Sequence, residues 1–455
     1  MWFEREKIIL ILILFAILSL FPNLDVLEFR GEESLRTLIA YEMFKEKNFL
    51  QPTVLGENYY LKPPLFNWLI ILYSFIFGWS ELTGRFLTIT FLVLNAILVY
   101  IFSFTLFKNK IFSLISSLIF LTFFDVIFWY GYLAEIDITY TFFIFLMITF
   151  LYTGFYENKN IFLFFAGIIL GISFLLKGFP SIAFFTFTLL GLIVYFKNLK
   201  IVLNPSLLTG LLFALFISFL WIINTANPEK YLYFLFYESL SRVDVNNNFD
   251  LINRLTNVLF FPILNFKQLL PTSFVVLLIF ISYYKTEKKI NIDTRIKTLI
   301  LVVIVNYLPF LISKSAGRYI LPLFPLIAII FAYFIVNIGK DKWIKVFITI
   351  SAFIILLRFL AGFIGIPIYM EKKISRKAIA EDMYTTINKS KNVAFDCYDE
   401  KVFALYLDLK LNTVIKKSNL SENWHYLIDC RNKENLKLLK EYDLKNSKIF
   451  IYERF

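Results

Sequence analysis

Long apolar runs separated by short polar links follow one another along the chain from Ile8 to Ile368. A run such as residues 86–107 is long enough, as a helix, to cross the hydrocarbon core of a bilayer. The pattern therefore predicts an α-helical polytopic membrane protein, with about 11–13 transmembrane helices. The clearest spans are residues 8–24, 86–107, 111–130, 138–156, 161–176, 180–196, 203–224, 269–284, 297–313, 319–338 and 343–368.

Links that contain lysine set the expected orientation of these spans, because Lys and Arg concentrate in the cytoplasmic links of membrane proteins. If the first span, residues 8–24, runs outward from a cytoplasmic N-terminus, every lysine-rich link falls inside. No small-residue cleavage site follows that span, so we expect it to be uncleaved. The inner links are KNK (108–110), ENKN (157–160), KNLK (197–200), the run 285–297, and GKDKWIK (339–345).

A long polar loop, residues 25–85, lies outside between the first two spans. Within it, residues 33–48 have the pattern of an amphipathic helix, with Leu38 and Met43 on its apolar side. Residues 64–79 are apolar but short for a span, and a crossing there would put the basic links outside. We expect both segments to be juxtamembrane helices that lie along the outer interface.

Ionisable residues at the ends of the expected spans all fall on this outer face. Charged side chains at membrane depth are costly and usually functional. Acids and bases that converge on one face favour a site for an anionic, lipid-attached substrate. The residues are Glu32, Glu33, Lys62, Glu135, Asp137, Lys177, Glu238, Arg242, Lys314 and Arg318.

Composition supports the membrane class and excludes a nucleic-acid-binding protein. The chain is 59% hydrophobic and 20% aromatic, and its mean hydropathy is +0.70. The net charge of +12 comes from basic residues in short links between apolar segments, which is the distribution of topology signals and not of a basic binding surface.

From residue 371 onward the composition becomes that of a soluble domain, so we expect two domains, 1–370 and 371–455, with the second a small α/β unit on the outer face. Strands are predicted at NVAFDC, NTVI, HYLIDC and KIFIYERF, and helices at DEKVFALYLDL and RNKENLKLLKEY. Cys397 and Cys430 either pair in an oxidising compartment or remain buried thiols. His425 is the single histidine, which predicts no metal cluster, and the tail contains no catalytic motif.

Six segments in order across residues 1–340 resemble motifs of the GT-C superfamily, within it the bacterial aminoarabinose transferase and protein mannosyltransferase-like (PMT-like) branch. They are RGEESLRTLIAYEM, GENYYLKPPLFNWL, SELTGRFLTI, EIDITYTFF, FLLKGFPSI and SKSAGRYILPLFP. The resemblance implies a membrane glycosyltransferase that moves a sugar from a polyprenyl phosphate to a hydroxyl of a lipid, glycan or protein acceptor on the outer face of the bacterial cytoplasmic membrane, with an expected inversion at the anomeric carbon. No cofactor is implied, and the lipid-linked sugar is the donor.

The resemblance also suggests roles for individual residues. Glu32 is expected to be the catalytic base that takes the acceptor's proton, with Glu33 as the alternative and Asp137 as an orienting acid. Cations must neutralise the departing phosphate, and the candidates are Lys62, Arg318, Lys177 and Arg85. The candidates for acceptor binding are Glu135, Tyr59, Tyr60 and Arg242.

Three departures from the family pattern narrow the prediction. The first acid is Glu32, where relatives usually have Asp, and Leu61 precedes Lys62, where many relatives have Glu. The single histidine removes the partner that some aminoarabinose transferases use, with that Glu, to hold zinc. We therefore predict no zinc site, and we expect a sugar other than aminoarabinose.

Other functions remain open at this point. A flippase or transporter of lipid-linked glycans would also place charges at membrane depth, but inverted repeats are typical of transporters and none is seen here. An O-antigen ligase or polymerase would be expected to have its large functional loop late in the chain, and the loop at 225–268 keeps that class open. A degenerate transferase that serves as a scaffold is the third alternative.

Overall fold

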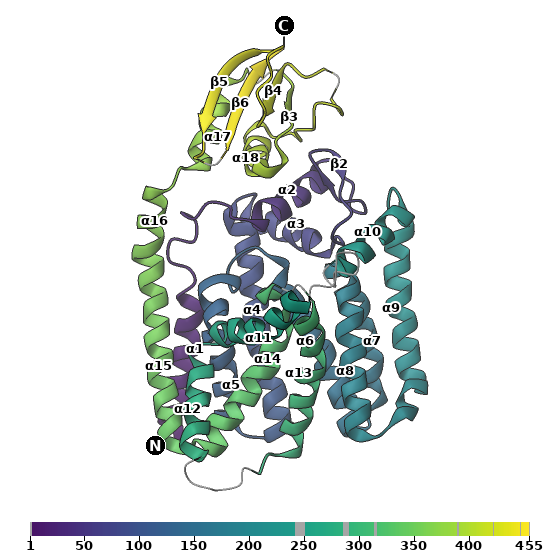
Figure 1. Ribbon diagram of the computed structural model, residues 1–455, viewed down its shortest axis with the longest axis vertical. Helices are drawn as coiled ribbons and strands as arrows, with labels where there is room; N and C mark the ends of the chain where they lie inside the picture. The colour runs from purple at the N-terminus through teal and green to yellow at the C-terminus, as the bar shows by residue number, and fades with distance from the viewer. Residues whose placement is uncertain are drawn as a thin grey trace.

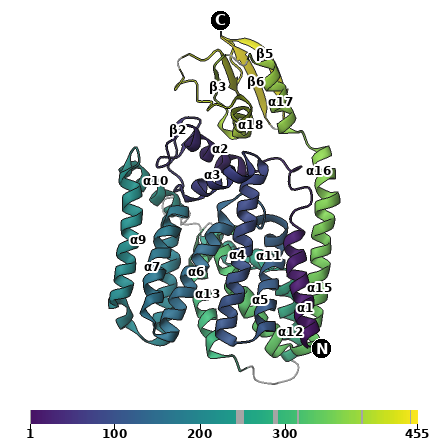
Figure 2. The same ribbon diagram turned by 180° about the vertical axis from the view of Figure 1, so that it is seen from behind.

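The computed structural model describes residues 2–241, 251–284, 291–313, 316–388, 391–421, 423–445 and 447–454. A bundle of long helices forms one end of the molecule, a layer of two short helices crosses the end of this bundle, and a small α/β module lies beyond that layer (Figure 1). The N-terminus lies at the far end of the bundle from the C-terminus, and both views show this arrangement (Figure 2).

The bundle and its connections contain most of the helices. They are α1 (Trp2–Leu18), α4 (Glu81–Phe107), α5 (Lys110–Thr122), η1 (Val126–Tyr130), α6 (Ile136–Glu157), α7 (Asn160–Lys177), α8 (Phe179–Phe196), η2 (Leu199–Leu203), α9 (Pro205–Ile223), α10 (Pro228–Leu240), α11 (Leu251–Gln268), α12 (Thr272–Tyr284), α13 (Thr294–Ile312), η3 (Gly317–Leu323), α14 (Phe324–Tyr333), η4 (Phe334–Ile338), α15 (Lys340–Leu360), η5 (Ala361–Gly365) and α16 (Ile366–Lys372).

The expected polytopic helical fold is confirmed, but the number of spans differs from the prediction. Within the described residues, 8 helices are long and apolar enough to cross a membrane, or up to 9 if one bent pair is a single span. The expected span 269–284 belongs to that pair, whose two helices meet at 105°. The expected span 111–130 is interrupted because α5 ends at Thr122 and the π-helical segment η1 begins at Val126, just after the polar Asp125.

Short turns join the helices at the end of the bundle where the N-terminus lies (Figures 1 and 2). Lys108, Asn158 and Lys197 end α4, α6 and α8 in the left-handed backbone conformation, with φ of 50°, 52° and 52°. Each of these residues lies in a link that was expected to be cytoplasmic. These three links therefore share one end of the bundle, as the expected orientation requires.

Small residues allow α7 and α9 to pack closely. A Cβ atom added to Gly167 would lie 2.3 Å from the carbonyl carbon of Gly210, and one added to Gly171 would lie 2.8 Å from the Cα of Ala214. Side chains are excluded at these contacts, so the two backbones touch, as in small-xxx-small packing of membrane helices. This contact fixes the position of α7, whose last residue is Lys177.

Two short helices, α2 (Glu32–Lys45) and α3 (Leu65–Phe77), form the layer across the outer end of the bundle, joined by a hairpin of β1 (Thr53–Val54) and β2 (Glu57–Asn58). Both predicted loop helices are thus present. The polar side of α2 is buried as well as its apolar side, because the C-terminal helix α18 (Lys401–Leu411) packs against it. Glu42, for example, accepts hydrogen bonds from Thr53 Oγ1 at 2.7 Å and from the Leu55 amide at 2.6 Å.

The expected C-terminal α/β module consists of α17 (Arg376–Thr386), β3 (Val393–Phe395), η6 (Tyr398–Glu400), α18, β4 (Tyr426–Asp429), β5 (Lys437–Asp443) and β6 (Lys448–Glu453). The strand order is β3-β4-β6-β5, with β3 and β4 parallel and the other pairs antiparallel. The division of the chain at residues 370 and 371 remains a prediction. Cys397 and Cys430 form a disulfide with a Cα–Cα distance of 5.1 Å, which resolves the alternative left open by the sequence.

Two expectations for this module are wrong. RNKENLKLLKEY was predicted to be a helix, but its second half lies in the edge strand β5. Its pairing with β6, for example Leu438 with Tyr452 and Tyr442 with Ile449, outweighs a local pattern that favours helix. In the described segment 412–415 no strand forms from NTVI, and the nearest pairing is an isolated bridge between Ala394 and Lys416.

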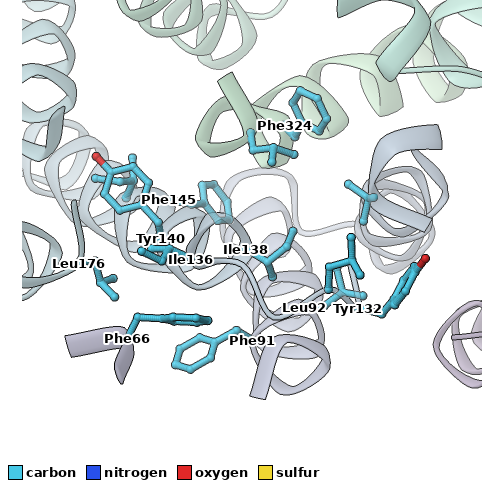
Figure 3. Close-up of a cluster of buried hydrophobic side chains, with 14 of the residues drawn as sticks. Phe66, Phe91, Leu92, Tyr132, Ile136, Ile138, Tyr140, Phe145, Leu176 and Phe324 are labelled. Atoms are coloured by element: carbon cyan, nitrogen blue, oxygen red, sulfur yellow. The ribbon is translucent and has the colours of Figure 1, made fainter. Parts of the chain in front are cut away.

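A buried apolar cluster fixes the start of α6 against its neighbours (Figure 3). Phe66 of α3, Phe91 of α4, Leu176 of α7 and Phe324 of α14 surround it, each less than a tenth exposed. Ile136 and the residues after it therefore have a fixed position at the outer end of the bundle. Acidic residues next to Ile136 are held in place by this packing.

Candidate active site

A cavity of about 460 Å³ opens at the outer end of the bundle, beneath α2. One part of its wall is charged and the other part is apolar. The charged and polar wall contains Glu32, Arg36, Tyr59, Lys62, Asp137, Tyr140, Lys177, Glu238, Ser239, Asn306, Ser313, Arg318, Tyr319 and Tyr398. The apolar wall contains Leu35, Leu61, Ile136, Phe179, Pro180, Ala183, Phe184, Phe187, Leu235, Phe236, Leu240, Pro309 and Phe310.

Glu32 is the first residue of α2 and lies between two guanidinium groups. Arg36 donates to Glu32 Oε2 at 2.6 Å, and Arg318 approaches Oε1 at 3.3 Å. Burial raises the pKa of Glu32, but the nearby Arg36 and Arg318 outweigh it and lower the pKa to about 2. Since its side chain is still 37% exposed, Glu32 is a carboxylate that solutes in the cavity can reach.

Arg36 was not among the predicted site residues, although it lines the cavity. It is buried, and in addition to Glu32 it donates to Tyr59 Oη at 3.3 Å. The spacing of four residues from Glu32 puts both side chains on the same face of α2. That spacing was the available sequence signal. The amphipathic pattern instead puts Arg36 on the polar side of the helix, opposite Leu38 and Met43.

Three other cations reach the cavity from different elements, and each contacts a carboxylate. Arg318 of η3 bridges Glu32 and Glu135, whose Oε2 is 3.4 Å away. Lys177, the last residue of α7, lies 2.6 Å from Asp137 and 4.8 Å from the centre of the Tyr140 ring. Asp137, which was expected to be an orienting acid, is thus paired with Lys177.

Lys62 forms the third such pair, with Glu238 of α10 at 3.1 Å. Two prolines follow Lys62, which restricts the backbone and the direction of the ammonium group. The sequence placed Glu238 on the outer face but gave it no role, because the element that contains it shows no resemblance to a family motif.

Glu135 precedes α6 and does not itself line the cavity. Burial and the neighbouring Asp137 raise the pKa of Glu135 to about 7. Its contact with Arg318 links it to the charged wall, so its protonation state changes the charge that Arg318 faces.

Glu33 and Arg85 lie outside the cavity and form a fully buried ion pair. Both side chains are 0% exposed, with Arg85 Nη2 2.8 Å from Glu33 Oε2 and Nε 2.9 Å from Oε1. Glu33 also accepts from the backbone amides of Ala134 at 2.9 Å and Arg30 at 3.0 Å. The pair ties the start of α2 to α4 and to the segment before α6, which is a structural arrangement.

Other predicted residues have different surroundings. Tyr59 lines the cavity, whereas Tyr60 packs against Tyr231 and Phe234, with ring centres 5.3 and 5.9 Å away. Arg242 and Lys314 lie outside the described residues. Over the described part of the chain, no group of three or more His, Cys, Asp or Glu side chains is placed to hold a metal ion.

Comparisons with known proteins extend this picture. Residues 61–223 match the family model described as dolichyl-phosphate-mannose-protein mannosyltransferase. An undecaprenyl phosphate-alpha-4-amino-4-deoxy-L-arabinose arabinosyl transferase of Wigglesworthia glossinidia brevipalpis is 35% identical over 150 residues, which are 32% of this chain and 26% of that protein. A transferase of the same description from Proteus mirabilis (strain HI4320) is 25% identical over 240 residues, 51% of this chain and 43% of that protein. The matches thus span less than half the length of these relatives.

Solved structures match over almost the whole chain. The crystal structure of ArnT from Cupriavidus metallidurans bound to undecaprenyl phosphate aligns with a TM-score of 0.73 and 14% identity, and covers 98% of this chain and 97% of that chain. The apo structure of the same protein aligns with a TM-score of 0.71 and 12% identity over the same shares. At this identity the alignment shows the fold. Together, the fold, the family model and the relatives confirm the resemblance inferred from the motifs: the chain is a multi-pass membrane protein with the fold of ArnT, and it resembles the PMT-like branch of the GT-C superfamily.

Proposed function

We propose that this protein is a membrane glycosyltransferase that moves a sugar from a polyprenyl-phosphate donor to an acceptor hydroxyl at the outer face of the bacterial cytoplasmic membrane. The main support is one cavity in which an accessible carboxylate, Glu32, lies among Arg318, Lys62 and Lys177 and beside an apolar wall. A polyprenyl-phosphate sugar has three parts that match this cavity. The apolar wall suits its lipid tail, the cations suit its phosphate, and the carboxylate lies where the sugar would react. The ArnT structure with undecaprenyl phosphate supports the choice of a prenyl phosphate.

We assign the apolar wall to binding of the donor's prenyl chain and the cations to binding of its phosphate. Phe184 and Phe187 of α8 and Phe310 of α13 provide apolar surface on helices that are long and apolar enough to span a membrane. Arg318 can hold two phosphate oxygens with its planar guanidinium group, and Lys62 and Lys177 add positive charge. These cations already contact carboxylates, so the bound phosphate shares them with Glu238 and Asp137.

We assign Glu32 as the catalytic base. The acceptor oxygen attacks the anomeric carbon and the bond to the phosphate oxygen breaks, while Glu32 accepts the hydroxyl proton. The departing polyprenyl phosphate gains negative charge, which Arg318, Lys62 and Lys177 stabilise. One displacement by the acceptor inverts the anomeric configuration.

Donor binding also makes Glu32 a better base. Arg36 and Arg318 hold the pKa of Glu32 at about 2. When the phosphate engages Arg318, the carboxylate loses part of this stabilisation and gains an anionic neighbour, so its pKa rises toward the ordinary range. Proton uptake by Glu32 is then favoured when the donor is in place.

The test is transfer of labelled sugar from a pool of polyprenyl-phosphate sugars, using membranes that contain wild type, Glu32→Gln or Glu46→Gln. Glu46 follows α2 at the helix end away from the cavity and serves as the matched control. We expect transfer by wild type and Glu46→Gln, with a loss of about 10²–10⁴-fold in Glu32→Gln. Undiminished transfer by Glu32→Gln would contradict the assignment of the base.

A further inference from the structure

The C-terminal module contributes one side chain to the cavity, and it is the aromatic ring of Tyr398. The other described lining residues come from positions 32–319, that is, from the bundle and its outer layer. Tyr398 belongs to η6, which lies along the chain between β3 and α18 of the module, and this module lies beyond α2 as seen from the bundle (Figure 1). The ring thus approaches the site from outside the membrane, whereas Phe184 and Phe310 approach it from the membrane-spanning helices.

Tyr398 is fixed from both sides along the chain. Cys397, directly before it, is joined by a disulfide to Cys430 at the end of β4. Glu400, two residues later, accepts from Arg376 Nε at 3.1 Å and from Ser447 Oγ at 3.1 Å. A turn held by a covalent bond and by two partly buried polar contacts is restricted in its motion, which favours one position of the Tyr398 side chain.

The module itself is firmly docked on the outer layer. Tyr41 of α2 donates to the Asp408 carbonyl at 3.1 Å, and Tyr406 of α18 donates to Glu81 Oε1 at 3.0 Å. Leu55 of the hairpin accepts from the Lys417 amide at 3.0 Å. Because α2 also bears Glu32, the position of Tyr398 relative to the base is set by these contacts.

The surroundings of the ring leave it available to a ligand. The ammonium group of Lys401 lies 4.6 Å from the centre of the Tyr398 ring and covers one of its faces. Tyr398 is nevertheless 40% exposed. Burial, and then the nearby Tyr59, raise the pKa of Tyr398, which keeps the phenol protonated and able to donate a hydrogen bond. A flat apolar face with a polar edge fits a sugar ring, which has C–H groups on its faces and hydroxyls around its rim.

We propose that Tyr398 is an acceptor-binding residue: the C-terminal module places its ring over the outer side of the cavity, where it holds the sugar of a saccharide acceptor with a hydroxyl directed at Glu32. This inference rests on the proposed function and deepens it. The donor's lipid enters from the membrane side, so the acceptor hydroxyl approaches from the opposite side, where Tyr398 lies. The module is thereby part of the active site, and the acceptor is a glycan or glycolipid.

The test uses the full-length protein as wild type, Tyr398→Ala, Tyr398→Phe and Leu438→Ala. Leu438 is 48% exposed on the edge strand β5 of the same module and controls for general effects of truncation. Transfer is measured with increasing amounts of the glycolipid fraction of the source cells, and separately with their protein fraction. Binding of undecaprenyl phosphate is measured independently, and thermal melting checks that each variant is folded.

We expect the half-saturating amount of glycolipid to rise at least tenfold in Tyr398→Ala and to stay within about threefold of wild type in Tyr398→Phe and Leu438→Ala. Binding of undecaprenyl phosphate should stay within about twofold in every variant. An unchanged acceptor requirement in Tyr398→Ala, an equal loss of donor binding, or transfer to the protein fraction alone would overturn the inference while the proposed function stands. A folded wild type that transfers to neither fraction overturns the proposed function and, with it, this inference.

Discussion

Two adjacent glutamates, Glu32 and Glu33, should respond in opposite ways to the same substitution. Glu32→Gln and Glu33→Gln each replace a carboxylate at the start of α2 with a neutral amide of nearly the same shape. Glu32 faces the cavity and is 37% exposed, whereas Glu33 is 0% exposed and pairs with Arg85, which is also 0% exposed. The account therefore predicts a loss of catalysis in the first variant and a loss of stability in the second.

The magnitudes follow from the surroundings of each side chain. In Glu33→Gln the Arg85 guanidinium loses its buried counter-charge, which typically costs about 3–5 kcal/mol. Arg85 keeps its bonds to the carbonyls of Leu24, Leu27 and Glu28, so we expect the lower half of that range. In Glu32→Gln the buried Arg36 also loses its counter-charge, but Glu32 itself is 37% exposed and water can reach the pair, so we expect a smaller cost of about 1–3 kcal/mol, while the loss of the base costs about 10²–10⁴-fold in rate.

Thermal unfolding of the purified protein in detergent, together with the transfer rate of the remaining folded fraction, separates the two effects. Glu33→Gln should melt well below wild type and keep a near-normal rate per folded molecule. Glu32→Gln should melt closer to wild type than Glu33→Gln does, and should show little transfer per folded molecule. The double variant Glu33→Gln/Arg85→Met should be less destabilised than the sum of its single changes, because no buried charge is left unpaired. A Glu33→Gln protein that is as stable as wild type but inactive would refute this division of roles.

Three further changes test other parts of the structure. Burial and Asp137 raise the pKa of Glu135 to about 7, so below pH 7 this residue is neutral and leaves Arg318 freer for phosphate; Glu135→Gln should bind undecaprenyl phosphate more tightly than wild type at pH 8, and the difference between the two proteins should shrink as pH falls through 7. The disulfide between Cys397 and Cys430 closes a loop with a sequence separation of 33, which corresponds to about 4 kcal/mol; reductant should lower the melting temperature and the acceptor affinity of wild type, and leave a double serine variant unaffected. Gly167→Leu should force α7 away from α9 and reduce both the yield of folded protein in detergent and its transfer rate, and a normal yield would contradict the close packing described here.

The sequence predicted the parts of this protein that depend on hydrophobic pattern and charge. Lysine-rich links gave an orientation in which the acids and bases near Glu32, Asp137 and Arg318 fall on one face, and the structure brings these three residues to one cavity. The loop helices could be predicted because an amphipathic period and the parity of the spans both indicated them. Charges at span ends are informative because burying them without a partner is costly.

Other features depend on tertiary contacts that no local pattern contains. Glu32 and Glu33 are chemically identical neighbours, and only the position of Arg85 shows which of them is buried. The helical pattern of residues 431–442 gives way to strand pairing with β6. Tyr398 lies about eighty residues beyond the nearest lining residue along the chain, in a module without a recognisable motif, so its place in the cavity follows only from the docking of that module on α2.

A single reconstitution experiment tests most directly whether the protein transfers sugar to an acceptor or moves lipid-linked sugar across the bilayer. Purified protein is placed in sealed liposomes with labelled polyprenyl-phosphate sugar and the glycolipid fraction, and both sugar transfer and movement of the donor across the bilayer are measured. We expect label on the acceptor with wild type, little with Glu32→Gln, and, with both proteins, no faster movement of donor between the leaflets than in protein-free liposomes. Donor that crosses the bilayer in a protein-dependent way, without any sugar transfer, would contradict the transferase proposal and identify a flippase.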